Sequence, residues 1–546
     1  MGTNSLLLSI AGVPKILSDF IPDNGLAILA ASLKDNGHSV RILDTNTTST
    51  LEQVFDDTHL SGIKTIAEKI FIKKRKPSIL DMIRLKPISN CLEKRKDLIF
   101  NKISDDICRE IKENCVDFVG MKLWAGDGFK YSLDIARNIK RKFPQIKIFG
   151  GGPQVDIFQE EIFKVTDSFD ALCFGDGEET INGFADFVAG KTQLDTIPNI
   201  IFRKNGKIIK NQRRFVEDLS TLPIPEYHQD IYTGIGDKIK MFVVDESRGC
   251  PNYCAFCIHP VKSGKLREKP VSRIVGELEN FISEYGVRVF RYAGSNTPGD
   301  LLEKTSMQVI NKGLNIAYTT FGHFDSMKDV DFNIVRKSGC MSIFFGLESA
   351  SPEILNKAMH KKNSPDVMES VIRSCKKARI FTVVSVIYPS PFETDQTRKQ
   401  TMDFILKTRP DSVLIQFPGL YPGTVWGKNP SMFNFTVETD NYAEDIMTYQ
   451  IKQLFPPRYW KPLPYKVNGM DFRQYAGETE RFQKELCDAG ITTFVSDEAY
   501  LLSRFSGFKS MVDFVDYNRY FLFAGLAGEI RKEINVINEN ISRGIG

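Results

Sequence analysis

Three cysteines crowded into one short stretch constrain this chain more than any other feature of its sequence. Cys250, Cys254 and Cys257 fall within eight residues, with three and then two residues between them. Three thiolates can bind three irons of a [4Fe–4S] cluster and leave the fourth iron free to bind a small molecule. A structural zinc site with His259 as a fourth ligand is the alternative, but zinc ligands usually come as two separated pairs, and no second pair follows. The spacing therefore favours a cluster with one open iron.

Strand and helix patterns alternate regularly from just before the cysteine stretch onward. Runs rich in β-branched and aromatic residues mark six strands, and amphipathic segments between them mark helices. Six parallel β/α units predict a central partial (β/α)6 barrel over residues 236–440. The expected strands are 240–245, 288–292, 315–319, 341–345, 381–387 and 412–417, and the expected helices are 271–285, 301–312, 327–338, 351–359, 365–378 and 394–408.

The cysteine stretch resembles the motif of the radical S-adenosylmethionine (radical SAM) enzymes. The CxxxCxxC spacing, with Arg248-Gly249 before it and Phe256 before the last cysteine, carries the resemblance. The resemblance implies that Cys250, Cys254 and Cys257 bind a [4Fe–4S] cluster, whose open iron chelates S-adenosylmethionine. It also implies a (β/α)6 barrel, in agreement with the strand pattern.

The same resemblance implies a binding site for S-adenosylmethionine around the cluster. The backbone of Phe256 would lie against the adenine. Ala293-Gly294-Ser295 stands where the family often has Gly-Gly-Glu, so only a backbone role carries over to it. Glu348, in a Gly-x-Glu-Ser turn, would contact the methionyl or ribose part, and a carboxylate that favours a helix N-terminus is the alternative. His323 and Tyr318 either face the substrate or are ordinary loop residues.

A second α/β pattern precedes the barrel, over residues 1–190. Its alternation predicts a Rossmann-like parallel sheet, interrupted by a helical insertion at residues 50–115. Glycine-rich turns follow two of the strands, and glycine there lets a ligand approach the backbone closely. The expected strands include 6–10, 39–44, 117–124 and 146–149, with helices at 26–36 and 131–143.

These segments look like the cobalamin-binding domain that precedes many radical SAM barrels. The run from Pro22 to Asp44 and the two glycine-rich turns carry the resemblance. It implies that cobalamin lies over the carboxyl ends of the strands, with its nucleotide tail inside the domain. The pattern Asp-x-His-x-x-Gly, which supplies an axial histidine elsewhere, is absent, and His38 is interpreted as structural. Trp124 is interpreted as an aromatic floor for the cofactor, with a core role as the alternative. The implied contacts are Gly150, Gly151, Gly152, Pro153, Gly175, Gly177 and Glu178.

Two further segments complete the predicted organisation. Residues 191–235 combine a hairpin centred on Asn205-Gly206 with a proline-spaced linker. Residues 441–546 are expected to form a mainly helical C-terminal domain, with helices at 476–490, 495–515 and 517–542.

Composition excludes several classes of protein. A net charge of +4 in 546 residues gives no reason to expect nucleic acid as a partner, and the basic run Lys73–Lys76 is interpreted as a solvated surface, with an acidic or phosphate-bearing partner as the alternative. There is no run of 18 apolar residues and no signal-peptide pattern, so neither a membrane span nor secretion is expected. Single, scattered cysteines outside the trio and an air-sensitive cluster favour a cytoplasmic location.

Together the resemblances imply a cobalamin-dependent radical SAM enzyme, similar to the class B radical SAM methyltransferases. The commonest chemistry there is methylation of an unactivated carbon or phosphorus of a small-molecule or peptide substrate, through a 5′-deoxyadenosyl radical and methylcobalamin. An external electron donor of the flavodoxin or ferredoxin type is also implied. The alternatives are a cyclase or rearrangement enzyme that uses cobalamin without methyl transfer, and a non-catalytic cobalamin or redox sensor.

Overall fold

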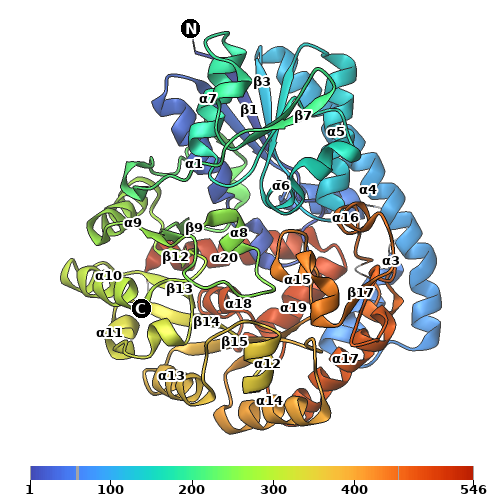
Figure 1. The fold of residues 1–546 in the computed structure, drawn as a ribbon, viewed down its shortest axis with the longest axis vertical. Helices are drawn as coiled ribbons and strands as arrows, with labels where there is room; N and C mark the ends of the chain where they lie inside the picture. The colour runs from blue at the N-terminus through green and yellow to red at the C-terminus, as the bar shows by residue number, and fades with distance from the viewer. Residues whose placement is uncertain (1, 57–60, 453, 545–546) are drawn as a thin grey trace.

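Two parallel sheets dominate the computed structural model, which describes residues 2–56, 61–452 and 454–544 (Figure 1). The sheet nearer the N-terminus has the strand order β7-β6-β5-β4-β3-β1-β2-β8. Its strands are parallel except for the hairpin β6–β7, which the Asn205-Gly206 signal predicts and which pairs antiparallel with β5. The hairpin and β8 therefore extend this sheet, whereas the sequence predicts a separate hairpin and linker at residues 191–235. The bounds are β1 Asn4–Ser9, β2 Ser39–Asp44, β3 Phe118–Lys122, β4 Lys147–Gly151, β5 Ala171–Cys173, β6 Ile200–Lys204, β7 Lys207–Lys210 and β8 Tyr232–Thr233.

Helices cover both faces of this sheet because successive strand residues point to opposite sides. Leu7 packs in one core with helices α1 (Asn24–Asp35) and α7 (Glu178–Val188). Its neighbours Leu6 and Leu8 pack in a second core with α4 (Ile79–Glu113) and α5 (Asp127–Lys142). The sheet is therefore the middle layer of a Rossmann-like domain, as predicted.

The second sheet has six parallel strands in the order β16-β15-β14-β13-β12-β9, so its two edge strands are the first and the last in the sequence. All six predicted strands and the six predicted helices are present, which confirms the partial (β/α)6 barrel. The strands are β9 Met241–Val244, β12 Val289–Tyr292, β13 Ala317–Gly322, β14 Cys340–Glu348, β15 Phe381–Ile387 and β16 Ser412–Gln416. The helices are α9 Val271–Tyr285, α10 Gly299–Asn311, α11 Phe332–Lys337, α12 Pro352–Lys357, α13 Pro365–Lys377 and α14 Asp395–Thr408.

The C-terminal hundred residues are mainly helical, but two of the expected helices are wrong. The expected helix 495–515 is interrupted at 504–510, where Ser510 caps the start of a new helix by accepting a hydrogen bond from the Asp513 N–H. The expected helix 517–542 is interrupted at Gly525, whose φ of +65° is left-handed. The elements are α15 Val425–Lys428, β17 Phe435–Val437, α16 Tyr442–Met447, β18 Tyr465–Val467, α17 Phe472–Asp488, α18 Asp497–Ser503, α19 Met511–Phe523 and α20 Ala527–Arg543.

The insertion at 50–115 is helical, as expected, and packs against these C-terminal helices. It comprises α2 (Thr48–Phe55), α3 (Ser61–Ala67), a π-helical turn (Glu68–Ile72) and α4. Its residues share one apolar core with residues of α18–α20 and with barrel residues such as Met241 and Val289, near the amino ends of their strands. The insertion and the C-terminal helices therefore support the barrel at the end opposite the cysteine loop. Among the described ranges, no helix has the length and apolar character needed to cross a membrane.

Candidate active site

The cysteine loop follows β9 at the carboxyl end of the barrel strands and is fixed at several points. The short strands β10 (Ser247–Arg248) and β11 (Arg267–Glu268) pair antiparallel at its base. The Ala255 N–H donates to the Met359 carbonyl at 2.9 Å, and the Ala255 carbonyl accepts from the Trp426 N–H at 3.0 Å. Gly249 has a φ of +81°, and a Cβ there would lie 2.1 Å from a backbone oxygen, so only glycine fits immediately before Cys250.

The three cysteines are half-buried and lie close enough to influence one another electrostatically. Burial raises the pKa of Cys257 to about 12, and the neighbouring Cys254 and Cys250 act in the same direction. No three His, Cys, Asp or Glu side chains in the described part of the chain converge on a single metal-ion position. A [4Fe–4S] cluster has no need of such convergence, because each thiolate binds a different iron, and its positive irons offset the repulsion among three thiolates. The trio therefore fits a cluster.

The predicted S-adenosylmethionine contacts surround this loop. Ser295 joins it through a 2.8 Å hydrogen bond between its Oγ and Nδ1 of His259. Glu348 is close enough to Cys254 to affect its pKa, and its own carboxylate accepts from Lys361 Nζ and Ser385 Oγ, both at 3.2 Å. Phe256 packs against the indole of Trp426, with ring centroids 5.7 Å apart.

A buried carboxylate that the sequence reasoning missed holds the loop after β12 in place. Glu246 accepts hydrogen bonds from the Gly294 N–H, at 3.1 and 3.0 Å to its two oxygens, and from Thr297 Oγ1 at 2.6 Å. Burial raises its pKa to about 7. Because Ala293 and Ser295 flank Gly294, Glu246 determines how all three approach the cysteine loop. Its position two residues after the barrel strand β9 was the signal that could have identified it.

The two side chains considered for substrate contact lie in different surroundings. Tyr318 is buried, stacks on Tyr292 at 4.5 Å and bonds to the hydroxyls of Ser306 and Ser338. It is a core residue. His323 has a buried Nε2 atom with no hydrogen-bond partner among the described residues. Burial lowers its pKa to about 4, so its imidazole is neutral at pH 7.

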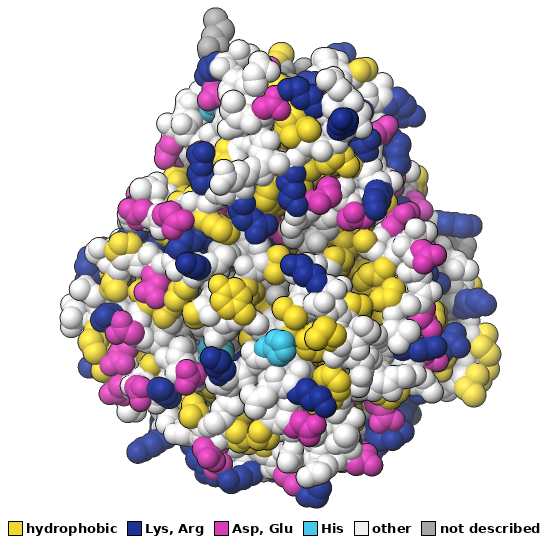
Figure 2. Space-filling view, in the orientation of Figure 1, with side chains coloured by type: hydrophobic (Ala, Val, Ile, Leu, Met, Phe, Trp, Pro, Cys, Tyr) yellow, Lys and Arg dark blue, Asp and Glu magenta, His cyan; other side chains and the backbone are white. Residues whose placement is uncertain are grey.

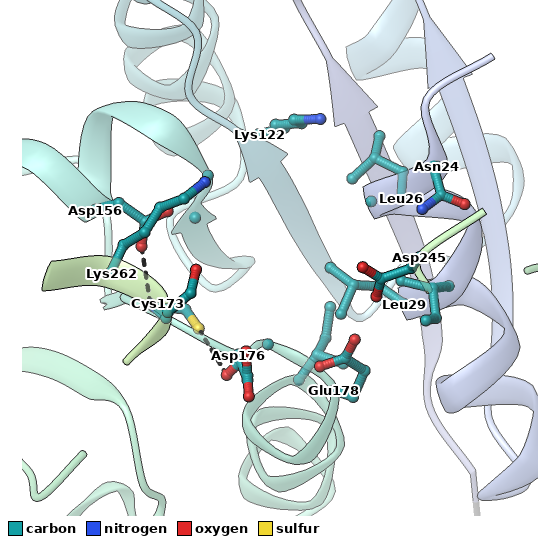
Figure 3. A pocket seen from close by; sticks show the side chains of 18 of the residues that line it. Asn24, Leu26, Leu29, Lys122, Asp156, Cys173, Asp176, Glu178, Asp245 and Lys262 are labelled. Atoms are coloured by element: carbon teal, nitrogen blue, oxygen red, sulfur yellow. Dashed lines mark hydrogen bonds between the residues drawn. The ribbon is translucent and has the colours of Figure 1, made fainter. Parts of the chain in front are cut away.

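A cavity of about 440 Å³ lies between the N-terminal sheet and the barrel (Figure 3). Part of its lining is apolar and includes Leu7 of β1, Leu26 and Leu29 of α1, and Phe149 of β4. Charged side chains also line the cavity, with Asp156 and Lys262 on one side, Asp245 on the other, and Lys122 across from Glu178 (Figure 3). The barrel contributes Ser247, Arg248, His259, Ala293 and Ser295 to the wall.

The lining of this cavity fits a large, flat cofactor with a tail. Six glycines border it, so backbone forms much of the wall: Gly25, Gly120, Gly151, Gly152, Gly175 and Gly177. A Cβ at Gly151 would have no neighbour nearer than 3.8 Å, so any side chain there would project into free space. The apolar part of the lining suits the aromatic base of a nucleotide tail, and the strand ends at Lys122 and Gly151 suit the ring system.

The predicted cobalamin contacts divide into two groups. Gly151, Gly152, Gly175, Gly177 and Glu178 border the cavity, whereas Gly150, Pro153 and Trp124 are not among its lining residues. Trp124 donates its indole N–H to Ser9 Oγ at 3.0 Å, and the Lys122 ammonium lies 4.1 Å from its ring centroid. His38 accepts from the Thr3 N–H at 3.1 Å and likewise lies outside the lining. Lys122, which lines the cavity and pairs with Asp23 at 2.8 Å, was missed by the sequence reasoning.

An interdomain ion-pair cluster (Arg248, Arg267, Asp176 and Glu178) joins the two domains beside the cavity. Arg248 Nη2 and Nη1 donate to the two Glu178 oxygens at 2.6 and 3.1 Å, and its Nε donates to Asp245 at 2.7 Å. Arg267 Nη1 donates to Asp176 at 2.6 Å. Burial alone would lower the pKa of Arg248, but the surrounding carboxylates raise it well above its usual value. The glycine-rich turn of one domain is thus bound to the residue two positions before Cys250 in the other.

Comparison with known protein families identifies both domains. A model of the radical SAM superfamily matches residues 247–405, and a model of the B12 binding domain matches residues 88–185. The chain thus carries a radical SAM domain and a B12 binding domain, the combination found in cobalamin-dependent radical SAM enzymes. Its cofactors are therefore a [4Fe–4S] cluster, S-adenosylmethionine and cobalamin, in agreement with the fit of the cysteine trio and of the cavity.

Individual proteins also resemble this chain, one in sequence and two in fold. It is 28% identical over 339 residues to an uncharacterized methyltransferase of Pyrococcus horikoshii, covering 60% of this chain and 72% of the relative. The radical SAM methyltransferase TsrM from Kitasatospora setae, solved with cobalamin and a [4Fe–4S] cluster, has a TM-score of 0.64 at 13% identity, covering 98% and 99% of the two chains. The cobalamin-dependent S-adenosylmethionine radical enzyme OxsB has a TM-score of 0.56 at 13% identity, covering 93% of this chain and 63% of that one. At 13% identity, the similarity to TsrM and to OxsB shows a shared fold only.

Proposed function

We propose that the enzyme methylates an unactivated carbon, or a phosphorus, of a small-molecule or peptide substrate. The observation that supports this most strongly is the position of the cavity. Strand ends of the B12 domain form one wall, and the residues that lead to Cys250 and the loop after β12 form the other. Methyl transfer to a substrate radical needs a radical source and a methyl donor on two sides of one substrate, and a shared cavity provides that geometry.

Protein groups at the cavity would position the cofactors and the substrate. When bound, the reduced cluster and cobalamin would supply, respectively, the electron that cleaves S-adenosylmethionine to a 5′-deoxyadenosyl radical and the methyl group for transfer. Glu246 would hold the backbone of Gly294 against S-adenosylmethionine, and Arg248 would fix the distance between the two cofactor sites. The apolar part of the lining would exclude water from the reacting groups.

The proposed partners follow from this chemistry. Enzymes of the radical SAM superfamily use a reductant and a substrate. For this enzyme we expect a one-electron donor of the flavodoxin or ferredoxin type, since the cluster must be reduced before each cleavage.

The test uses protein prepared anaerobically with iron, sulfide and cobalamin, then reduced in the presence of S-adenosylmethionine that carries a deuterated methyl group. We expect both 5′-deoxyadenosine and S-adenosylhomocysteine, because one molecule is cleaved and another supplies the methyl group. Cys254→Ala should abolish 5′-deoxyadenosine, whereas the control Cys487→Ala, at an exposed cysteine in α17, should not.

Each of the other results of this experiment would favour one of the alternative functions or refute the cluster ligands. 5′-Deoxyadenosine without S-adenosylhomocysteine or a labelled product would favour a cyclase or rearrangement enzyme. A parent protein that forms neither compound would favour a sensor. Unchanged 5′-deoxyadenosine formation by the Cys254 variant would refute the assignment of the cluster ligands.

A further inference from the structure

The first turn of α4 exposes large apolar side chains to solvent. Ile79, Leu80 and Ile83 are 79%, 65% and 61% exposed. At 100° per residue they lie on one face of the helix. Leu85 and Ile88, the next two aliphatic residues of α4, are buried instead, in the core shared with α5. The exposed trio is therefore not part of the face that holds α4 to the protein.

Basic residues surround this trio. Lys73, Lys74, Arg75, Lys76, Arg84 and Lys86 are all exposed. Asp81, the one acidic residue in the segment, is buried and bonds to Lys69 and Ser78. Residues 73–86, hereafter the basic–apolar edge, thus carry six positive charges against one negative charge, a surplus of +5 compared with +4 for the whole chain.

Four of these cations are available to a partner. Lys73 pairs with Glu68 and Lys74 pairs with Asp516. Within the described ranges, Arg75, Lys76, Arg84 and Lys86 form no ion pair. Figure 2 shows apolar and basic side chains next to each other at the right-hand edge of the molecule, where Figure 1 places the start of α4.

We propose that the basic–apolar edge docks this enzyme on the surface of a membrane that contains anionic lipids. Lys76, Arg84 and their basic neighbours would pair with lipid phosphates, while Ile79, Leu80 and Ile83 enter the headgroup region. Basic side chains next to an apolar face are the combination that binds such a surface. The location suits the role, because Figure 1 places the edge at the rim of the molecule, away from α8 (His259–Ser263), which borders the cavity.

Two other occupants fit the observations less well. A second copy of this chain would set one surplus of +5 against another, and this repulsion opposes a symmetric contact. A nucleic acid would accept the cations, but would offer no apolar environment for the three exposed aliphatic side chains. An anionic lipid surface satisfies both the charge and the apolar face.

The experiment measures co-sedimentation of the full-length, cofactor-loaded protein with vesicles under anaerobic conditions. One set of vesicles is pure phosphatidylcholine, and the other contains roughly 30% phosphatidylserine to provide the negative surface potential. We expect binding to the second set alone, weakened when the salt is raised to about 0.5 M because exposed charges are then screened.

Variants separate the two contributions to binding. Replacing Lys76 and Arg84 by glutamine should weaken binding roughly thirtyfold, at about a factor of five for each charge. Replacing Ile79, Leu80 and Ile83 by serine should weaken it about tenfold or more. Leu98→Ser, at another exposed leucine of α4, and the double change Lys304→Gln with Lys399→Gln, at exposed lysines of the barrel, are the matched controls and should bind like the parent.

Several results would overturn the proposal. The first is the absence of binding to phosphatidylserine vesicles at low salt, and the second is binding that none of the edge variants weakens. A sedimentation coefficient that rises with protein concentration, and falls back in the serine variant, would identify the edge as a contact between copies. Salt-sensitive binding to single-stranded RNA that is lost in the glutamine variant, without vesicle binding, would identify it as a nucleic-acid surface.

Discussion

Substitution of Arg248 perturbs the contact between the two domains most directly. Its guanidinium is 14% exposed and contacts Glu178 and Asp176 of the B12 domain and Asp245 of the barrel. Arg248→Met keeps much of the side-chain volume but removes every one of these bonds. Glu178 and Asp176 are each only 7% exposed, so two poorly solvated carboxylates would face a thioether. Asp176 would keep Arg267, whereas Glu178 would lose the only ion pair that it forms with a described residue.

The expected cost follows from the burial of the pair. Removing one partner from a buried ion pair costs about 3–5 kcal/mol, because the remaining charge is desolvated without compensation. The cost falls on the docked arrangement of the two domains, and about 1.4 kcal/mol corresponds to a factor of ten. The fraction of open molecules should therefore rise by a factor of about 10² to a few times 10³. Changing both Arg248 and Glu178 to methionine should recover part of this loss, since it removes the unpaired Glu178 charge, whereas Asp245 loses its Arg248 partner in the single and the double variant alike.

Hydrogen exchange measures this opening directly. Backbone amides in peptides covering 171–180 and 246–257 are followed by mass spectrometry in the parent, in Arg248→Met, in Glu178→Met and in the double variant. The four rates give a coupling free energy, which we expect to exceed about 2 kcal/mol for this buried pair. The exposed pair of Arg531 and Glu52, whose side chains are 43% and 60% exposed, is the matched control and should give less than about 1 kcal/mol.

One result would refute this reasoning. If the coupling between Arg248 and Glu178 is no larger than that of the exposed control pair, the interdomain ion-pair cluster does not hold the domains together. A slower exchange in Arg248→Met than in the parent would contradict it equally.

Two further predictions concern the cofactor cavity and the C-terminal helices. Gly151→Val should project a side chain into the cavity, so we expect the cobalt content to fall at least about tenfold while the iron content stays unchanged. The control is Gly236→Val, at a site where a Cβ meets nothing within 4 Å. An unchanged cobalt content in Gly151→Val would contradict the placement of cobalamin. Glu533 is buried with its Oε1 unpaired within the described structure, and burial raises its pKa to about 7. The pKa of Glu533 is thus higher in the folded protein than in the unfolded chain, where it is about 4.3. The folded state is therefore most stable at low pH, where Glu533 is protonated in both states, and it loses stability as the pH rises from about 4.3 towards 7. Glu533→Gln should therefore be the more stable protein at pH 8, by about 3 kcal/mol, with a difference in denaturation midpoint that shrinks towards pH 5; a difference independent of pH would contradict the assignment.

Local sequence patterns were sufficient to predict all six barrel strands and most strands of the N-terminal sheet, but not β8, which lies in the predicted linker. Each barrel strand is a short run of β-branched and aromatic residues, and each following helix has its own apolar face, so the alternation is visible without any knowledge of distant contacts. The hairpin at Asn205-Gly206 was predictable for the same reason, because two adjacent residues determine the turn. The position of the cysteine loop followed from the rule that loops at the carboxyl ends of parallel strands carry ligands.

Contacts between distant residues were not predictable in this way. Glu178 was expected to contact the cofactor, and its side chain does border the cavity, yet its two oxygens bind Arg248, seventy positions later in the sequence. The sequence shows that both residues are charged, but it contains no local sign that they meet. Glu246 and Lys122 were missed although Lys122 ends β3 and Glu246 lies two residues after β9, where the same positional rule applies.

The C-terminal helices show a different limit of sequence reasoning. An amphipathic pattern tells which face of a helix is apolar, but not which surface that face covers. Asp497, at the start of α18, accepts a hydrogen bond from Thr319 of β13 at 2.9 Å, and α20 packs against the insertion helix α2. These contacts join residues at least 178 positions apart. The role of residues 50–115 therefore became visible only in the folded chain.

The measurement that tests the central claim most directly is the iron and cobalt content of the full-length protein, prepared anaerobically with cobalamin supplied. We predict about four irons and one cobalt per chain, with iron lost in Cys254→Ala and cobalt retained in it. Iron without cobalt would contradict the claim that the cavity between the two domains holds cobalamin beside the cluster.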